Sequence, residues 1–193
     1  MKDKPLFNGE FVNIRAVNLE KDAAPEAAWT RNLVYAGYLT DEDPARPLSI
    51  FQVKKRQEAM HKRMNERHNS YNYGIHSVSD DELIGFFRVG YVLWPVAAGF
   101  MRIMLGDPAE YHTPAGREAL AMSLRYAFDE LNLYRVGTSV IESDTDLIEE
   151  MKRAGYVLEV RQRECAFRAG KLQDRLYYGM LRSEWSAGQG EEA

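Results

Sequence analysis

The stretch FMRIMLGDPAEYHTPAGREALAMSLRYAFDELNLYRVGTSVI, residues 100–141, contains the pattern that decides the fold. It opens with the β-type run Phe100–Leu105, continues after Pro114 with helical periodicity, and ends in a second β-type run, Val136–Ile141. The apolar residues of the helical part share one face: Leu120, Leu124, Ala127, Phe128 and Leu131. A strand, a helix and a strand in this order predict a parallel pair joined by a crossover.

The residues before this stretch predict antiparallel strands and two helices. Strand-like runs occur at Phe11–Ala16, Tyr71–Ser77 and Leu83–Val92, and the last two form a meander with the strand at 100–105. One helix is expected from Asn18 to Trp29, and a second ends near Arg67.

The residues after it predict one more helix and two strands. Ser143 followed by an acid three residues later is typical of a capping box, so a helix is expected to start near Asp144 and to end at Gly155. Strands are predicted at Val157–Phe167 and Leu172–Leu181. We therefore expect one α+β domain, residues 1–185, with a mixed, mostly antiparallel sheet of six to seven strands flanked by helices, and a disordered tail at 186–193.

The composition excludes several classes of protein. With 25 Lys and Arg against 29 Asp and Glu, the net charge of −4 gives no general attraction for nucleic acid. The single cysteine, Cys165, excludes an internal disulfide and a multi-cysteine zinc site, so no metal is predicted and a cytoplasmic location is expected. No apolar run approaches the ~18 residues of a membrane span, and no membrane partner is expected.

Seven short motifs occur in an order that resembles a known family. They are GEFVNIR (9–15), LIG (83–85), IMLGDP (103–108), GREAL (116–120), YAFDELNLYRV (126–136), KRAGY (152–156) and the run from Asp174 through Gly179 to Leu181. Together they resemble the GNAT superfamily of N-acetyltransferases, in its branch of ribosomal-protein and spermidine acetyltransferases. The resemblance implies the acyl-CoA N-acyltransferase fold and acetyl-CoA as the cosubstrate.

The resemblance also implies where acetyl-CoA binds. A pyrophosphate needs backbone N–H donors at a helix N-terminus, and the corresponding loop is Tyr111–Arg117. Its first expected glycine is Pro114, which lacks an N–H, whereas the second is present. The implied cofactor-binding residues are Thr113, Ala115, Gly116 and Arg117 of this loop, Ile103, Met104 and Leu105 through their main chain, and Asp144 where relatives carry asparagine.

The groups that would handle protons do not match the family pattern. Phe100 stands where many relatives have glutamate, and Met151 stands where a tyrosine is common. Methionine has no proton to donate. The candidate catalytic residues are therefore His76 and His112, which titrate near neutral pH, and Glu142, which follows a strand.

Three functions follow from this sequence. The first is transfer of an acetyl group from acetyl-CoA to a primary amine of a small molecule or a peptide terminus. The second is a catalytically weak or inactive module of the same fold that binds an acyl-CoA or another ligand, as Pro114, Phe100 and Met151 suggest. The third is a protein–protein role in a homodimer, through an apolar patch of Tyr91, Trp94 and Phe100. The alternatives for these aromatic residues are that they line the acceptor pocket, which is preferred, or pack in the core.

Overall fold

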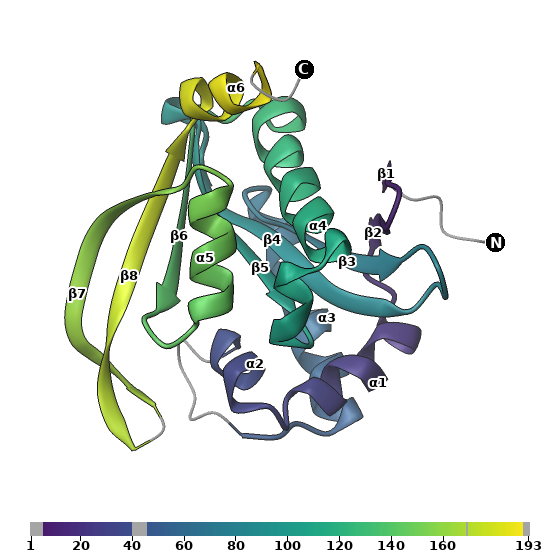
Figure 1. Cartoon of the computed structure of the whole chain (residues 1–193). Helices are drawn as coiled ribbons and strands as arrows, with labels where there is room; N and C mark the ends of the chain where they lie inside the picture. The colour runs from purple at the N-terminus through teal and green to yellow at the C-terminus, as the bar shows by residue number, and fades with distance from the viewer. Residues whose placement is uncertain (1–5, 40–45, 169, 191–193) are drawn as a thin grey trace.

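The computed structural model describes residues 6–39, 46–168 and 170–190, and its described strands form one sheet (Figure 1). The strand order is β1-β2-β3-β4-β5-β6-β8-β7. The strands are β1 (Phe7–Asn8), β2 (Val12–Ala16), β3 (Tyr71–Ser77), β4 (Leu83–Leu93), β5 (Ala98–Leu105), β6 (Arg135–Ile141), β7 (Val157–Arg168) and β8 (Lys171–Leu181). All seven predicted strands are present, and the two-residue β1 raises the number of strands in the sheet to eight.

The centre of the sheet contains its parallel pair. β5 and β6 run parallel, as the crossover pattern predicts, and every other described pair is antiparallel. The pairing of β5 with β6 covers only three positions and ends at Phe100 opposite Gly137. Beyond that point no described position of β5 is paired with β6, and residues of both strands line two small spaces that we call the opening.

Six described helices accompany the sheet (Figure 1). They are α1 (Leu19–Trp29), α2 (Leu33–Tyr38), α3 (Ile50–Arg67), α4 (Pro114–Arg125), α5 (Thr145–Arg153) and α6 (Arg182–Gly190). α4 and α5 follow β5 and β6 in the chain and lie in front of the sheet in this view, whereas α1 and α2 lie at its lower end. The carboxyl-terminal ends of β5 and β6 thus point toward the beginnings of α4 and α5.

Local signals explain where several of the described helices begin. Ser49 and Gln52 form a complete capping box at α3, and the Thr113 hydroxyl accepts from the Gly116 N–H at α4. α5 starts after Asp144 as expected, but no side chain caps it, so the predicted capping box at Ser143 is wrong.

Two helices depart from the sequence prediction. The helix predicted to run to Leu131 continues past Arg125 as a π-helical turn, Tyr126–Glu130. α6 extends through Gly190, so the disordered tail expected from residue 186 is wrong for residues 186–190, and residues 191–193 lie outside the described ones.

The edge strand β7 is irregular and exposed. Its register against β8 shifts twice, between Leu158 and Val160 and between Gln162 and Ala166. Glu164, inside the second irregularity, has a left-handed φ of 50°. Each shift inserts extra residues on one strand, which bends the strand and interrupts its ladder.

No described helix is long and apolar enough to cross a membrane.

Candidate active site at the divergence of β5 and β6

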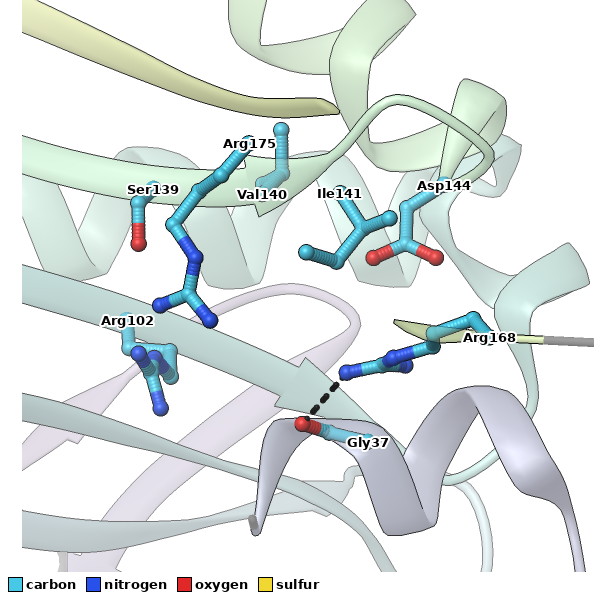
Figure 2. A pocket seen from close by; sticks show the side chains of 8 residues that line it. All are labelled: Gly37, Arg102, Ser139, Val140, Ile141, Asp144, Arg168 and Arg175. Atoms are coloured by element: carbon cyan, nitrogen blue, oxygen red, sulfur yellow. Dashed lines mark hydrogen bonds between the residues drawn. The ribbon is translucent and has the colours of Figure 1, made fainter. Parts of the chain in front are cut away.

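Two small spaces lie between the separated halves of β5 and β6. The inner cavity, about 10 Å³, is lined by residues that include Met101, Ile103, Leu120, Thr138, Met151 and Tyr156. The outer pocket, about 20 Å³, is lined by Gly37, Asp144 and three arginines among others (Figure 2). Arg102 and Ser139 line both spaces, so the two are adjacent. Each holds roughly one water molecule, which means that side chains of the chain itself fill most of the opening.

The main chain of β5 at the opening is bonded to Tyr111. The buried hydroxyl of Tyr111 accepts a hydrogen bond from the N–H of Leu105 at 3.1 Å and donates one to the carbonyl of Ile103 at 3.2 Å. Ile103, Met104 and Leu105 are the residues expected to face the cofactor through their main chain. Two of the groups they offer are therefore taken by Tyr111, and the expected cofactor contact of these three residues stays a prediction.

The loop before α4 forms hydrogen bonds to its own backbone. The Gly116 N–H is bonded to Thr113 Oγ1 at 3.1 Å, and Pro114 has no N–H. A Cβ at Gly116 would lie 2.0 Å from the carbonyl oxygen of Glu110. This glycine therefore makes room for the preceding 3₁₀ helix, Pro108–His112, which is a role that the sequence did not reveal.

A cluster of charged side chains connects this loop to α5. The carboxylate of Glu150, 2% exposed, lies 3.0 Å from His112 Nδ1, 3.1 Å from Arg117 Nε and 3.4 Å from Arg153 Nε. His112 Nε2 lies 3.0 Å from Asp146. Burial raises the pKa of the Glu150 carboxyl, but the hydrogen bonds from His112 and Arg117 outweigh it and leave that pKa below its ordinary value. Hydrogen bonds to Asp146 and Glu150 raise the pKa of His112.

The three predicted catalytic residues lie in three different places. His76 is on β3, two strands away from β5, in a separate pocket of about 350 Å³ with Asp22, Arg15 and Trp29. Burial lowers the pKa of His76, and the nearby Asp22 carboxylate opposes this effect. Because none of the residues lining that pocket lines the outer pocket or the inner cavity, His76 is not part of the site between β5 and β6.

His112 and Glu142 are also engaged elsewhere. His112 lies at the rim, with both ring nitrogens beside carboxylates. Glu142 accepts from the Asp174 N–H at 3.1 Å and lies 3.6 Å from Arg161 Nη1, so it ties the end of β6 to β8 and β7. The predicted set does not form one catalytic centre.

The aromatic residues expected near the acceptor do not line the opening. Tyr91 is 77% exposed at the end of β4, and the Trp94 indole donates to the main-chain oxygen of His68. Phe100 lines a different pocket, with Tyr177 and Glu159. These three residues therefore lie outside the site between β5 and β6, and their expected role in an acceptor pocket stays a prediction.

Two further residues in the opening carry titratable groups that the sequence analysis did not consider as catalytic candidates. Tyr156 lines the inner cavity, and its buried hydroxyl has no hydrogen-bond partner in the described part of the structure. Asp144, expected as a cofactor contact, lines the outer pocket and is 7% exposed. Burial raises the pKa of the Asp144 carboxyl, although Arg168 and a hydrogen bond from Ile141 oppose it. Tyr156 belongs to the motif KRAGY (152–156), but nothing in that motif marks it as a proton-handling group.

The described residues thus combine a split parallel pair, a crossover helix and a second helix at the same opening. The family model of the GNAT acetyltransferase domain matches residues 12–157, which contain all of these elements. The chain belongs to the GNAT acetyltransferase family. The acyltransferase fold and the family expected from the sequence are both confirmed.

A curated relative supports the same family over part of the chain. The probable N-acetyltransferase YjcK of Bacillus subtilis (strain 168) is 28% identical over 92 residues, which are 47% of this chain. The match spans half the length, 50%, of that relative. It therefore supports the family and leaves the activity of the whole protein to be proposed.

Solved GNAT structures share the fold over nearly the whole chain. A probable acetyltransferase superimposes with a TM-score of 0.77 at 20% identity, covering 94% of this chain and 99% of that one. Spermidine N-acetyltransferase from Vibrio cholerae, solved with CoA and spermine, gives 0.74 at 18% identity, covering 91% and 98%. At these identities the likeness concerns the fold alone.

The residues of this GNAT domain allow a test of whether the phosphates of acetyl-CoA fit. The glycine-rich type of cradle does not fit, because Pro114 lacks an N–H and the Gly116 N–H is already bonded. The cations that an anion could contact here are those around Glu150, with the carboxylate of Asp146 beside His112. Their side chains are 38% exposed for His112, 43% for Arg117 and 63% for Arg153, so they reach solvent at the surface between α4 and α5.

Proposed function

We propose that the chain is an N-acetyltransferase that moves an acetyl group from acetyl-CoA to a primary amine of a small molecule or a peptide terminus. The observation that supports this best is the separation of β5 and β6 beyond Phe100 and Gly137. It brings a tyrosine hydroxyl, a buried carboxylate and the start of two helices to one opening. The membership of the chain in the GNAT family supports the same reaction.

The residues that would hold acetyl-CoA are cationic side chains at the rim. His112, Arg117 and Arg153 would contact its phosphates, with Glu150 beneath them as the group that positions all three. When bound, acetyl-CoA would supply an acetyl group activated as a thioester. The predicted role of the Ala115 amide at the same helix start remains part of this proposal.

Asp144 is the proton acceptor in this proposal. A primary amine of the lysine type is protonated at neutral pH, with a pKa near ~10.4, and has to lose a proton before it can react. Asp144 is the one carboxylate among the described residues lining the outer pocket, and its raised pKa makes it a stronger base than an ordinary aspartate.

Tyr156 is the hydrogen-bond donor in this proposal. Burial raises the pKa of its phenol well above the ordinary value, so the group keeps its proton at neutral pH. Its hydroxyl has no partner in the described structure and can donate to negative charge that develops beside the inner cavity. This phenol follows α5, whereas the family pattern expects one at Met151, within α5.

Thiol release from acetyl-CoA in the presence of a panel of primary amines tests the proposal. We expect amine-dependent release, and we expect Asp144→Asn and Tyr156→Phe each to lower kcat by roughly 10²–10⁴-fold. The melting temperature of each variant controls for folding. Release that is absent with every amine would overturn the enzymatic function.

The second candidate is a GNAT-fold module that binds a ligand without turnover. The bonds from Tyr111 to β5 favour it, because they occupy main-chain groups at the opening. So does Met151, which is buried in the inner cavity and has no proton to give. Binding of acetyl-CoA by calorimetry without thiol release would support this second function. The homodimer and the cytoplasmic location expected from the sequence remain proposals.

A further inference from the structure

A larger pocket, of about 330 Å³, lies next to the opening and is formed by residues of β5, β6, β8 and β7, which are neighbours in the sheet (Figure 1). We call it the side pocket. Thr138 lines both the side pocket and the inner cavity. Ser139, which lines the outer pocket, is the register partner of Tyr177, which lines the side pocket. The side pocket is in the size range of binding sites for small molecules, and it borders both spaces of the opening.

The surface of the side pocket is mainly apolar. Gly137 of β6 has no side chain, and it lies opposite Phe100 at the last paired position of β5 and β6. A Cβ at Gly137 would lie 3.4 Å from Cδ2 of Phe100, so the phenyl ring lies beside this exposed stretch of backbone. Val160 of β7, which is 54% exposed, and Tyr177 of β8 add further apolar surface. A flat apolar group can therefore lie over Gly137 and contact these side chains.

The two charged side chains that line the side pocket are paired with each other. Glu159 of β7 and Arg135 of β6 form an ion pair, and the described lining contains no other carboxylate or cation. Glu159 lies at the first register shift of β7, and a Cβ at Gly179 would lie 2.2 Å from its Oε1. The irregularity thus directs the carboxylate over Gly179 and toward Arg135. The side pocket therefore offers apolar surface rather than a net charge.

We infer that the acceptor of this enzyme is a primary amine that carries an aromatic ring, and that the ring binds in the side pocket while the amino group reaches the opening. The inference rests on the proposed function. Contact of a ring with Phe100, Tyr177 and Val160 removes apolar surface from water, and the preferred geometries of aromatic pairs add to the attraction. A charged group in place of the ring would lose water beside a carboxylate that is already bound to Arg135. Only the small amino group then has to enter the opening.

The experiment compares phenyl amines with the same amines without the ring. The pairs are 2-phenylethylamine and ethylamine, 3-phenylpropylamine and propylamine, and 4-phenylbutylamine and butylamine, which vary the length between ring and nitrogen. Thiol release gives kcat/KM, expressed for the neutral amine so that differences in basicity have no effect. Calorimetry without acetyl-CoA gives binding independently of turnover. We expect the phenyl amine to exceed its partner by about tenfold or more in kcat/KM in at least one pair.

Substitutions in the side pocket provide the matched test. Val160→Glu places a charge on its apolar surface and should lower the ratio of kcat/KM between phenyl amine and partner by about tenfold. Val78→Glu, at another exposed valine directly after β3, is the control and should leave this ratio unchanged. Gly137→Val fills the space over the strand and should lower the ratio in the same way. If the Gly137 variant does not fold, the exposed position of Val160 still allows the test.

The possible results separate this inference from the proposed function. Ratios below about tenfold in all three pairs, or a ratio that Val160→Glu leaves unchanged, overturn the inference, while thiol release with any amine still supports the enzyme. If no amine releases thiol, the proposed function fails and calorimetry decides. Binding of a phenyl amine that Val160→Glu weakens then supports the side pocket as its site, and absent or unaltered binding overturns it. A changed sedimentation coefficient of Val160→Glu with an unchanged ratio also overturns it, in favour of an interface between copies of the chain.

Discussion

The Nδ1 of His112 lies 3.0 Å from Oε1 of Glu150, and this contact ties the loop before α4 to the middle of α5. The imidazole can form an ion pair only when it is protonated, so the contribution of this contact to stability depends on pH. The same contact places a cation at the rim of the proposed active site.

His112→Gln should therefore reduce stability in a defined pH range. The folded protein holds the pKa of His112 above 6.5, so the stabilisation is complete below pH 6.5 and is lost as pH rises through the raised value. It also requires ionised Glu150, whose ordinary pKa is 4.5. The difference in melting temperature between wild type and variant should be largest between pH 5 and 6.5 and should shrink as pH rises through the raised pKa of His112. His61→Gln on α3 is the control, and an equal difference at all pH values would contradict this expectation.

Glu118→Ala should loosen the amino-terminal strands from α4. The carboxylate of Glu118 accepts three main-chain N–H groups, those of Glu10, Phe11 and Val12, at 2.7–2.8 Å. Bonds to a charged acceptor are worth about 1.5–3 kcal/mol each, and removal of the acceptor should lower the free energy of unfolding by at least that amount. Chemical denaturation measures it, with Glu130→Ala near the end of the same helical segment as the control. Equal effects of the two substitutions would refute the anchoring role.

Tyr111→Phe and Tyr156→Phe remove the same atom with different expected results. At Tyr111 the loss leaves the Leu105 N–H and the Ile103 carbonyl without their partner, at a cost of about 1–3 kcal/mol in unfolding free energy. It also frees two groups of β5, so the dissociation constant for acetyl-CoA should fall. At Tyr156 the hydroxyl has no described partner, so stability should be unchanged while kcat falls. Denaturation, calorimetry and thiol release distinguish the two variants, and identical behaviour would contradict both assignments.

Met151→Tyr should destabilise the domain and should not raise kcat. Met151 is 2% exposed, and the adjacent cavity of about 10 Å³ cannot accept a phenol ring. Overpacking of this kind costs about 1–3 kcal/mol, whereas the volume-conserving Met151→Leu should cost less than about 1.5 kcal/mol. Thermal unfolding of both variants checks the order. A stable Met151→Tyr protein with a higher kcat would show that the site retains room for the phenol.

The periodicity of the sequence predicted the sheet because most strands bury one face. Val12 and Ile14 are fully buried and alternate with less buried residues, and the strand predicted from them is β2. The start of α4 was also predictable, since Thr113 and Pro114 are local signals for a helix N-terminus. The helix α2 has only six residues, too few for a clear helical period.

The candidate site was less predictable because it depends on which strands are neighbours. His76 has the right chemistry, and the predicted meander already places the strand at 83–92 between it and the strand at 100–105, but only the structure shows that the candidate site lies beyond β5, between β5 and β6. Glu118 and Val12 are 106 residues apart in the chain, and no pattern connects them. The role of Gly116 was assigned to a cofactor because its contact with the Glu110 carbonyl becomes visible only in three dimensions.

The two register shifts of β7 also bear on how the protein behaves at high concentration. A sheet that ends in a straight, exposed strand can recruit strands from other molecules and grow into insoluble aggregates. β7 exposes Val157, Val160 and Phe167, which would favour such growth. Its two interruptions and the charged run Arg161–Glu164 work against it, since another strand would find a continuous ladder over only a few residues. The irregular shape of β7 therefore opposes aggregation through this edge of the sheet.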